Sequence, residues 1–152
     1  MHKAVLDHFG FSRLPFSKVL SAKESFPTHS YTEAVSRLEY GIGSEDFLLL
    51  TGPIGVGKSV VLGAVMHSLD LNAYTPIYIR GNNLGEGELY KAILAALDRE
   101  PPRYTQPAKR MFFAVVSELS RKPIALIDDA QEMKDGALLS LKSMANFGSD
   151  SQ

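Results

Sequence analysis

The stretch Gly52–Ser59, with the sequence GPIGVGKS, constrains the fold of this chain more than any other part of it. Its spacing is G-x-x-x-x-G-K-[ST], the phosphate-binding loop called the P-loop or Walker A motif. Glycines let backbone N–H groups turn toward a polyphosphate without a Cβ in the way. The N-terminus of the helix that follows attracts the same anion. The motif therefore predicts a strand, a phosphate-binding loop and a helix in succession.

The flanking residues favour this interpretation over a chance run of glycines. Phe47–Thr51 is apolar and predicts a strand before the loop, and apolar residues recur on one face of a helix predicted from Lys58 to about Leu69. We expect Lys58 to contact the β- and γ-phosphates and to assist catalysis, and the Ser59 hydroxyl to bind Mg²⁺. The predicted nucleotide-binding residues are Gly52, Pro53, Ile54, Gly55, Val56, Gly57, Lys58, Ser59 and Val60.

A second motif ends the apolar run Ile124–Ile127, which predicts a strand buried on both faces. Asp128 and Asp129 follow at its carboxyl end, where open α/β sheets bind their ligands. This is the Walker B pattern over residues 124–129, in which Asp128 is expected to hold Mg²⁺ and Asp129 to orient the attacking water. The alternative is that the two aspartates cap the next turn.

The remaining pattern predicts alternating strands and helices after an N-terminal arm. Residues 1–28 are interrupted by prolines and glycines, and we expect the aromatic residues of this arm to pin it to the domain surface or to line a wall of the base pocket. Ser30 has the spacing of an N-cap paired with Glu33. The other predicted elements are a helix to about Gly41, a strand over 75–80, helices over 86–98 and 106–121, and a last helix over 136–147, capped by Asp135, with Leu138, Leu141 and Met144 inward.

Composition limits the class of protein. A chain of 152 residues with 45% hydrophobic residues fits a single globular domain. It has no cysteine and no apolar run of the roughly 20 residues that a membrane helix needs, so we expect a cytoplasmic protein. The net charge is −1, which gives no global attraction to nucleic acid. A local basic stretch, Arg99–Arg110, could still meet a DNA backbone, or be an ordinary solvated face.

The two motifs together resemble the AAA+ ATPases. The opening segment His8–Phe16, the segment Tyr31–Leu38 and the closing segment Asn146–Ser151 narrow the resemblance to the ExeA/GspA-type secretion ATPases and the TniB/TnsC-like ATP-binding proteins of transposons. This similarity implies a P-loop NTPase fold, an α/β parallel sheet with helices on both faces, that binds ATP with Mg²⁺. It divides the chain into the arm and a partial ATPase domain over residues 29–152.

The resemblance also implies a role in assembly and a domain that continues beyond residue 152. Such proteins assemble as rings or filaments, with ATP governing assembly either on DNA with a transposase or at a secretion complex. We favour the transposition role, with secretion as the alternative. The family pattern places a sensor strand, an arginine finger and lid helices after residue 152, so we expect a domain truncated after the Walker B strand and its helix. Alone, it should be marginally stable and hydrolyse ATP poorly, or act as an ATP-binding module without hydrolysis.

Overall fold

The computed structural model describes residues 2–11, 26–44 and 47–149. Helix α1, His2–Phe9, comes first, and helices α2, His29–Ile42, and α3, Lys58–Ser68, flank the glycine-rich loop. Strand β1, Tyr74–Arg80, is followed by α4, Glu86–Ala96, and α5, Thr105–Glu118. Strand β2, Lys122–Asp128, leads through a short 3₁₀ helix η2, Ala130–Glu132, into α6, Asp135–Ser149.

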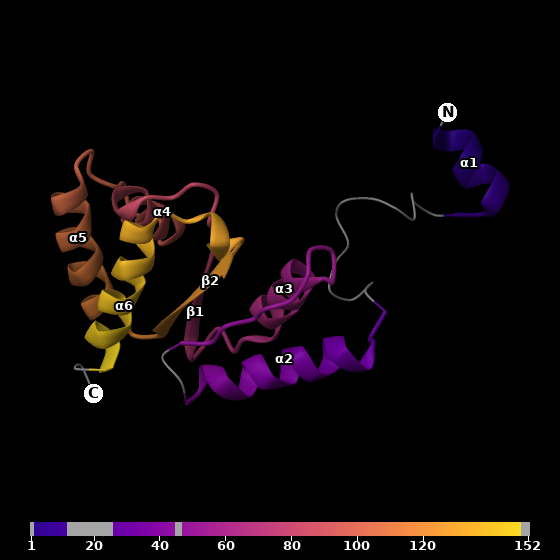
Figure 1. Ribbon diagram of the computed structural model, residues 1–152, viewed down its shortest axis with the longest axis horizontal. Coiled ribbons are helices and arrows are strands. Elements are labelled where there is room, and N and C mark those ends of the chain that lie inside the picture. Colours follow the sequence, from indigo (N-terminus) through magenta and orange to yellow (C-terminus); the bar gives the residue numbers. More distant parts are fainter. Residues whose placement is uncertain (1, 12–25, 45–46, 150–152) are drawn as a thin grey trace.

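The two strands form a parallel sheet in direct register, from Tyr74 opposite Lys122 to Arg80 opposite Asp128. Because parallel strands end at the same edge, Arg80 and Asp128 lie together at the carboxyl end. Helices α4, α5 and α6 cover one face of the sheet, and α2 and α3 lie on the other (Figure 1). The predicted α/β architecture with helices on both faces is confirmed.

Alternating side chains of the strands supply two separate hydrophobic cores. Ile77 and Ile79 of β1 face the α4–α6 layer, whose core includes the fully buried Tyr90. Leu126 of β2 faces the other layer, where it packs with Val65 of α3. Side chains alternate between the two faces of a strand, so the even-numbered Tyr78 and Asp128 are directed to the α3 side. Ala125 is exposed, so β2 is not buried on both faces as predicted.

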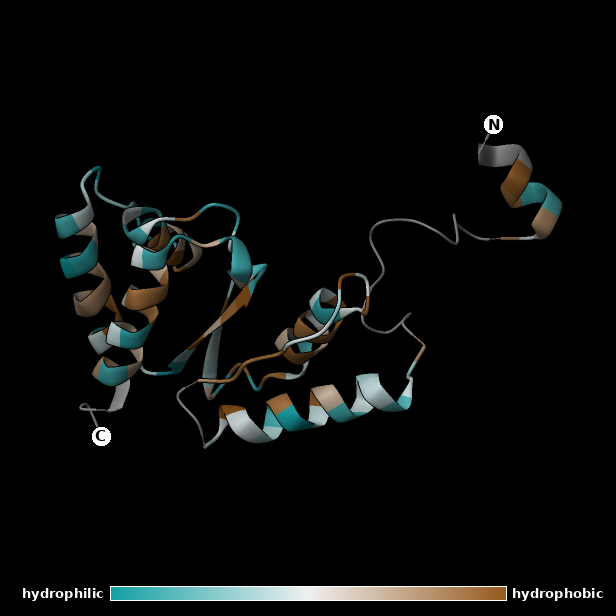
Figure 2. Ribbon diagram, in the orientation of Figure 1, coloured by the Kyte–Doolittle hydropathy of each residue, from teal (hydrophilic) through white to brown (hydrophobic). Residues whose placement is uncertain are grey.

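The predicted strand over Phe47–Thr51 is wrong for this structure. Residues 47–53 form irregular chain, and β1 and β2 are the strands of the described residues. Its apolar side chains are largely open to solvent, with Leu49 at 84% exposure. Figure 2 shows the segment before the loop as a brown, hydrophobic stretch. A strand is defined by backbone bonds to a neighbour, and no described segment pairs with this one.

Smaller departures concern helix ends and faces. The N-cap of α2 is Thr28, whose hydroxyl accepts a bond from the Tyr31 amide at 3.2 Å, so the prediction of Ser30 is wrong. Glu33 instead pairs with Arg37 one turn later. On α6 the buried residues are Ala137 and Ser140, whereas Leu138 is exposed and its predicted inward direction is wrong. Asp135 is the first residue of α6 and not its cap.

The described aromatic residues of the arm are exposed. Phe9 and Phe11 stack on each other with ring centroids 5.6 Å apart, and Phe26 is 83% exposed. Figure 1 shows α1 apart from the helices around the sheet. Phe16, which we also expected to act as an anchor, lies outside the described residues. Anchoring of the arm, and a wall of the base pocket formed by it, stay predictions.

Candidate nucleotide-binding site

The phosphate loop lies between the irregular segment 47–51 and the start of α3. Gly55 and Gly57 have φ angles of +86° and +96°, a backbone region that residues with a Cβ rarely adopt. Gly57 is also the N-cap of α3, and it offers no side chain to the first amides of the helix. Those amides have no partner within the helix and form an anion-binding end. Ile54 and Val56, at the tip of the loop, are exposed.

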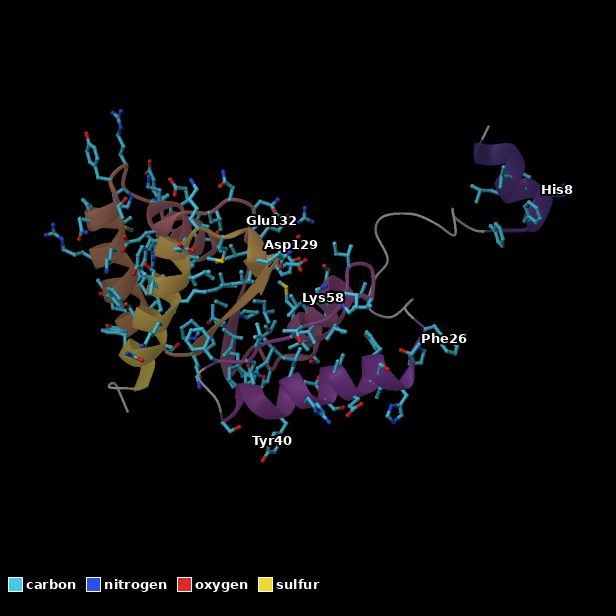
Figure 3. All side chains as sticks on the ribbon, in the orientation of Figure 1. His8, Phe26, Tyr40, Lys58, Asp129 and Glu132 are labelled. Atoms are coloured by element: carbon cyan, nitrogen blue, oxygen red, sulfur yellow. The ribbon has the colours of Figure 1, made fainter. Side chains whose placement is uncertain are left out.

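Lys58 closes the loop on itself. Its Nζ donates to the carbonyl oxygens of Gly52 and Pro53, both at 2.9 Å. These two carbonyls begin the loop and Lys58 ends it, so the ammonium ties the two ends together. Figure 3 labels Lys58 at the start of α3 and Asp129 beyond the carboxyl end of β2. Ser59 and Val60 occupy the first turn of α3 beside Lys58.

Asp128 is a buried carboxylate at the end of β2, with 7% of its surface exposed. Burial by itself raises the pKa of this carboxyl. The nearby Ser59 hydroxyl, the hydrogen bonds from the Tyr78 hydroxyl and the Asp129 amide, and the positive charge of Arg80 outweigh that effect and lower the pKa. Asp128 is therefore ionised at neutral pH. The interaction with Ser59 joins the helix after the phosphate loop to the Walker B strand.

Asp129 follows in a left-handed conformation, with φ of +55°. Its amide donates to Asp128 Oδ1 at 3.1 Å, and its own Oδ1 accepts from Gln131 Nε2 at 3.1 Å. Its carbonyl lies against Gly81, where an added Cβ would sit 2.5 Å from the oxygen. The chain thus turns sharply after Asp128 and presents the Asp129 side chain to solvent.

The donor set suits a hard cation that arrives with a polyphosphate. Magnesium prefers oxygen ligands, keeps several waters and binds through one or two carboxylates plus substrate phosphates. Asp128 and Ser59 supply a carboxylate and a hydroxyl on facing elements. No group of three His, Cys, Asp or Glu able to hold a metal occurs among the described residues. A cation would therefore need the nucleotide as a further ligand.

Some residues that interact with Asp128 were not predicted as part of this site. Tyr78 donates a hydrogen bond to Asp128 Oδ2 at 2.8 Å, and the Gly81 amide donates to the Asp128 carbonyl at 2.7 Å. Arg80, the last residue of β1, also acts on Asp128 through its positive charge. The position of Gly81 directly after a predicted strand could have indicated its close approach to another part of the backbone. Tyr78 carried no local signal.

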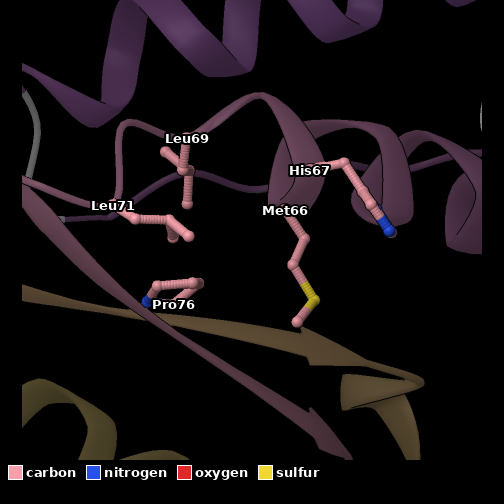
Figure 4. A pocket seen from close by; sticks show the side chains of 5 residues that line it. All are labelled: Met66, His67, Leu69, Leu71 and Pro76. Carbon is pink, nitrogen blue, oxygen red and sulfur yellow. The ribbon is translucent and has the colours of Figure 1, made fainter.

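Two hollows of the described surface lie away from the phosphate loop, one of them along α2. The other, of about 280 Å³, is lined by Met66, His67, Leu69, Leu71 and Pro76, between the end of α3 and the start of β1 (Figure 4). It lies at the amino end of β1, opposite the phosphate loop. Its lining is mainly apolar, so it does not offer a phosphate site.

A model of the family described as AAA domain matches residues 42–152. The match includes both Walker motifs. The chain belongs to this AAA domain family. Membership identifies the region as a nucleotide-binding ATPase domain, in agreement with the resemblance to AAA+ proteins. No curated protein and no solved structure matches the chain. No helix in the described ranges is long and apolar enough to cross a membrane.

Proposed function

We propose that this AAA domain is an ATP-dependent switch that binds ATP with Mg²⁺ and regulates the assembly of a larger complex, in DNA transposition. The observation that supports the nucleotide site is the effect of Ser59 on Asp128: the serine hydroxyl lowers the pKa of this carboxyl, and the first turn of α3 lies near the end of β2. A hydroxyl at a helix N-terminus and an ionised carboxylate then face each other. The position beside both groups suits the Mg²⁺ that accompanies the phosphates.

Binding follows from the residues of the loop. The open amides at the start of α3 receive the phosphates, and Lys58 exchanges its two carbonyl partners, Gly52 and Pro53, for phosphate oxygens. Ser59 and Asp128 hold the cation, which on binding neutralises phosphate charge. Because Lys58 already lies within the loop, the exchange needs no distant movement of the chain.

Hydrolysis is assigned to Asp129. Its carboxylate is exposed, one residue beyond Asp128, and would orient a water for attack on the terminal phosphate. In the present structure one of its oxygens is bonded to Gln131. That bond favours a second function, an ATP-binding module that senses nucleotide with little turnover until Gln131 releases Asp129. The unpaired segment 47–51 favours the same low-turnover state, because the loop is held on one side by irregular chain.

The assembly role rests on the family resemblance and on exposed apolar surface. Leu49 and Ile54, on either side of the loop start, are 84% and 100% exposed. Exposed apolar side chains favour burial against a partner. The partner that we propose is a further copy of this protein in a ring or filament. DNA and a transposase are the proposed later partners. The secretion role of the ExeA-like relatives is the alternative.

The proposal is tested by measuring binding of a fluorescent ATP analogue with Mg²⁺ or with excess chelator, and phosphate release in parallel. Lys58→Ala should abolish binding, and Lys142→Ala, a charge-matched change on the exposed side of α6, should leave it unchanged. Equal binding by both variants would overturn the nucleotide site. Binding without phosphate release would select the sensing module over the ATPase.

A further inference from the structure

The hydroxyl of Tyr78 reaches the Walker B carboxylate from the neighbouring strand. Tyr78 lies opposite Leu126 in the register of the sheet, so Asp128, two residues further, shares its face. The Tyr78 Oη donates to Asp128 Oδ2 at 2.8 Å, a bond between residues 50 positions apart. A hydrogen bond to an ionised group is stronger than one between neutral groups. The two side chains therefore act as one unit.

The other carboxylate oxygen of Asp128 accepts a hydrogen bond from a different element of the structure. Asp128 Oδ1 accepts the amide of Asp129 at 3.1 Å. Each oxygen of the Asp128 carboxylate accepts one of these hydrogen bonds, so rotation about the Cβ–Cγ bond is restrained. A carboxylate offers about four lone-pair positions, so these bonds leave others free. The free positions are the ones available to Ser59 and to a cation.

We propose that Tyr78 is a positioning residue of the magnesium–nucleotide site, which it serves by holding the Asp128 carboxylate in the orientation that meets Ser59 and the bound cation. The inference rests on the proposed function, since it concerns the same site. Magnesium demands near-ideal octahedral geometry, so the direction of a ligand matters more than for a larger ion. Groups that orient metal ligands commonly change metal affinity by about 10- to 100-fold.

The ring of Tyr78 has a structural role that is separate from that of the hydroxyl. It packs against the α3-side core that contains Val65 and Leu126. Tyr78→Phe keeps the ring in this core and removes the hydroxyl alone. Tyr74 is a matched control, because it lies four residues earlier on the same face of β1, packs against the same core and is opposite Lys122 instead of Leu126. Tyr74→Phe removes an equivalent hydroxyl at the far end of the strand.

The experiment is a Mg²⁺ titration of fluorescent ATP-analogue binding to the wild-type chain and to both variants. Tyr78→Phe should raise the half-saturating Mg²⁺ concentration by about tenfold, with analogue affinity in excess chelator changed less than about twofold because Tyr78 is not expected to touch the nucleotide. Tyr74→Phe should match the wild type in both measurements. A purely structural role for the Tyr78 hydroxyl would weaken binding equally with and without Mg²⁺.

A double-mutant cycle with Asp128→Asn tests the route of the effect. If Tyr78 acts through Asp128, adding Tyr78→Phe to Asp128→Asn should change the Mg²⁺ dependence by less than about twofold. An unchanged titration for Tyr78→Phe alone, or a full effect in the Asp128→Asn background, would overturn the inference while leaving the nucleotide site in place. A wild-type chain that binds no analogue with Mg²⁺ would overturn the proposed function, and the inference with it.

Discussion

The α-carbon of Gly81 lies against the carbonyl of Asp129, so close that a Cβ on Gly81 would come within 2.5 Å of that oxygen. The obstacle is backbone and cannot rotate away. The Gly81 amide also donates to the Asp128 carbonyl at 2.7 Å. The loop after β1 thus fixes the turn that carries both Walker B aspartates.

Gly81→Ala should therefore reduce stability by about 1–3 kcal/mol through overpacking, and should also weaken Mg²⁺-dependent nucleotide binding. Denaturant unfolding and the analogue-binding assay measure the two effects. Gly63→Ala is the control, because an added Cβ there meets nothing within 4 Å and Gly63 lies inside α3. That change should stabilise the chain by about 0.5–1 kcal/mol. Equal stability of the two variants would contradict the close approach at Gly81.

Gly57→Ala tests the left-handed turn at the start of α3. The φ of +96° is strained for alanine even though the space around the Cβ is open. We expect a loss of about 1–2 kcal/mol in the free energy of unfolding and a fall in nucleotide affinity, because the loop amides must reorient. An alanine variant with wild-type affinity would show that the loop does not bind phosphate in this conformation.

Asp129→Asn separates binding from hydrolysis. The amide keeps the size of the side chain, and its oxygen can still accept the bond from Gln131 Nε2. We expect analogue affinity to change less than about threefold, and any phosphate release to fall by about 100-fold or more, since base catalysis contributes about 10²–10⁴-fold. Phosphate release that survives the substitution would remove Asp129 from the catalytic role.

Gln131→Ala examines the contact that holds Asp129. Loss of the amide frees the Asp129 Oδ1, and it should raise phosphate release if that bond restrains the carboxylate. Steady-state phosphate release at saturating ATP is the measurement. If the variant releases phosphate more slowly than the wild type, Gln131 instead assists Asp129 in hydrolysis.

The pH dependence of stability has a contribution from Lys109. Its hydrogen bond to Glu86, 3.3 Å long, is the main cause that raises the pKa of Lys109 above 10.5. The folded chain then holds this proton more tightly than the unfolded chain, so the stabilisation is complete below pH 10.5 and is lost as the pH rises through the folded-state pKa.

Lys109→Met should accordingly cost less than about 1 kcal/mol near pH 8, because the pair is partly exposed. Denaturant unfolding at pH 9 and pH 11 should show a larger loss for the wild type than for the variant. An equal loss in both proteins would contradict a raised pKa for Lys109.

The sequence predicted those parts of the site that depend on neighbouring residues. The left-handed turn at Gly55 and Gly57, the helix from Lys58 and the aspartates at the end of the second strand all follow from local spacing, and the structure contains these elements. The roles of these residues stay predictions. The strand at Phe47–Thr51 did not form, because pairing depends on a neighbouring strand and the apolar pattern cannot supply one. The bond between Tyr78 and Asp128 depends on the register of two strands, which no local pattern fixes.

The N-terminal end of α2 and the buried face of α6 also depend on tertiary structure that local sequence does not determine. Ser30 and Thr28 are both good N-caps, and choosing between them requires the exit direction of the chain from the arm. Leu138 and Ala137 differ by one position on α6, and the smaller Ala137 is the one buried against the α4–α6 core. Apolar character alone favoured the leucine. Close packing between helices selected the small residue.

The central claim is that one bound nucleotide and its Mg²⁺ are held jointly by the loop at 52–59 and by Asp128. The direct test is a double-mutant cycle of Ser59→Ala and Asp128→Asn, with fluorescent ATP-analogue affinity measured with Mg²⁺ and with chelator. We predict that each change removes most of the Mg²⁺-dependent gain in affinity and that the double variant loses little more than either single one. Additive losses, or a Mg²⁺ effect that survives in the double variant, would contradict a shared site.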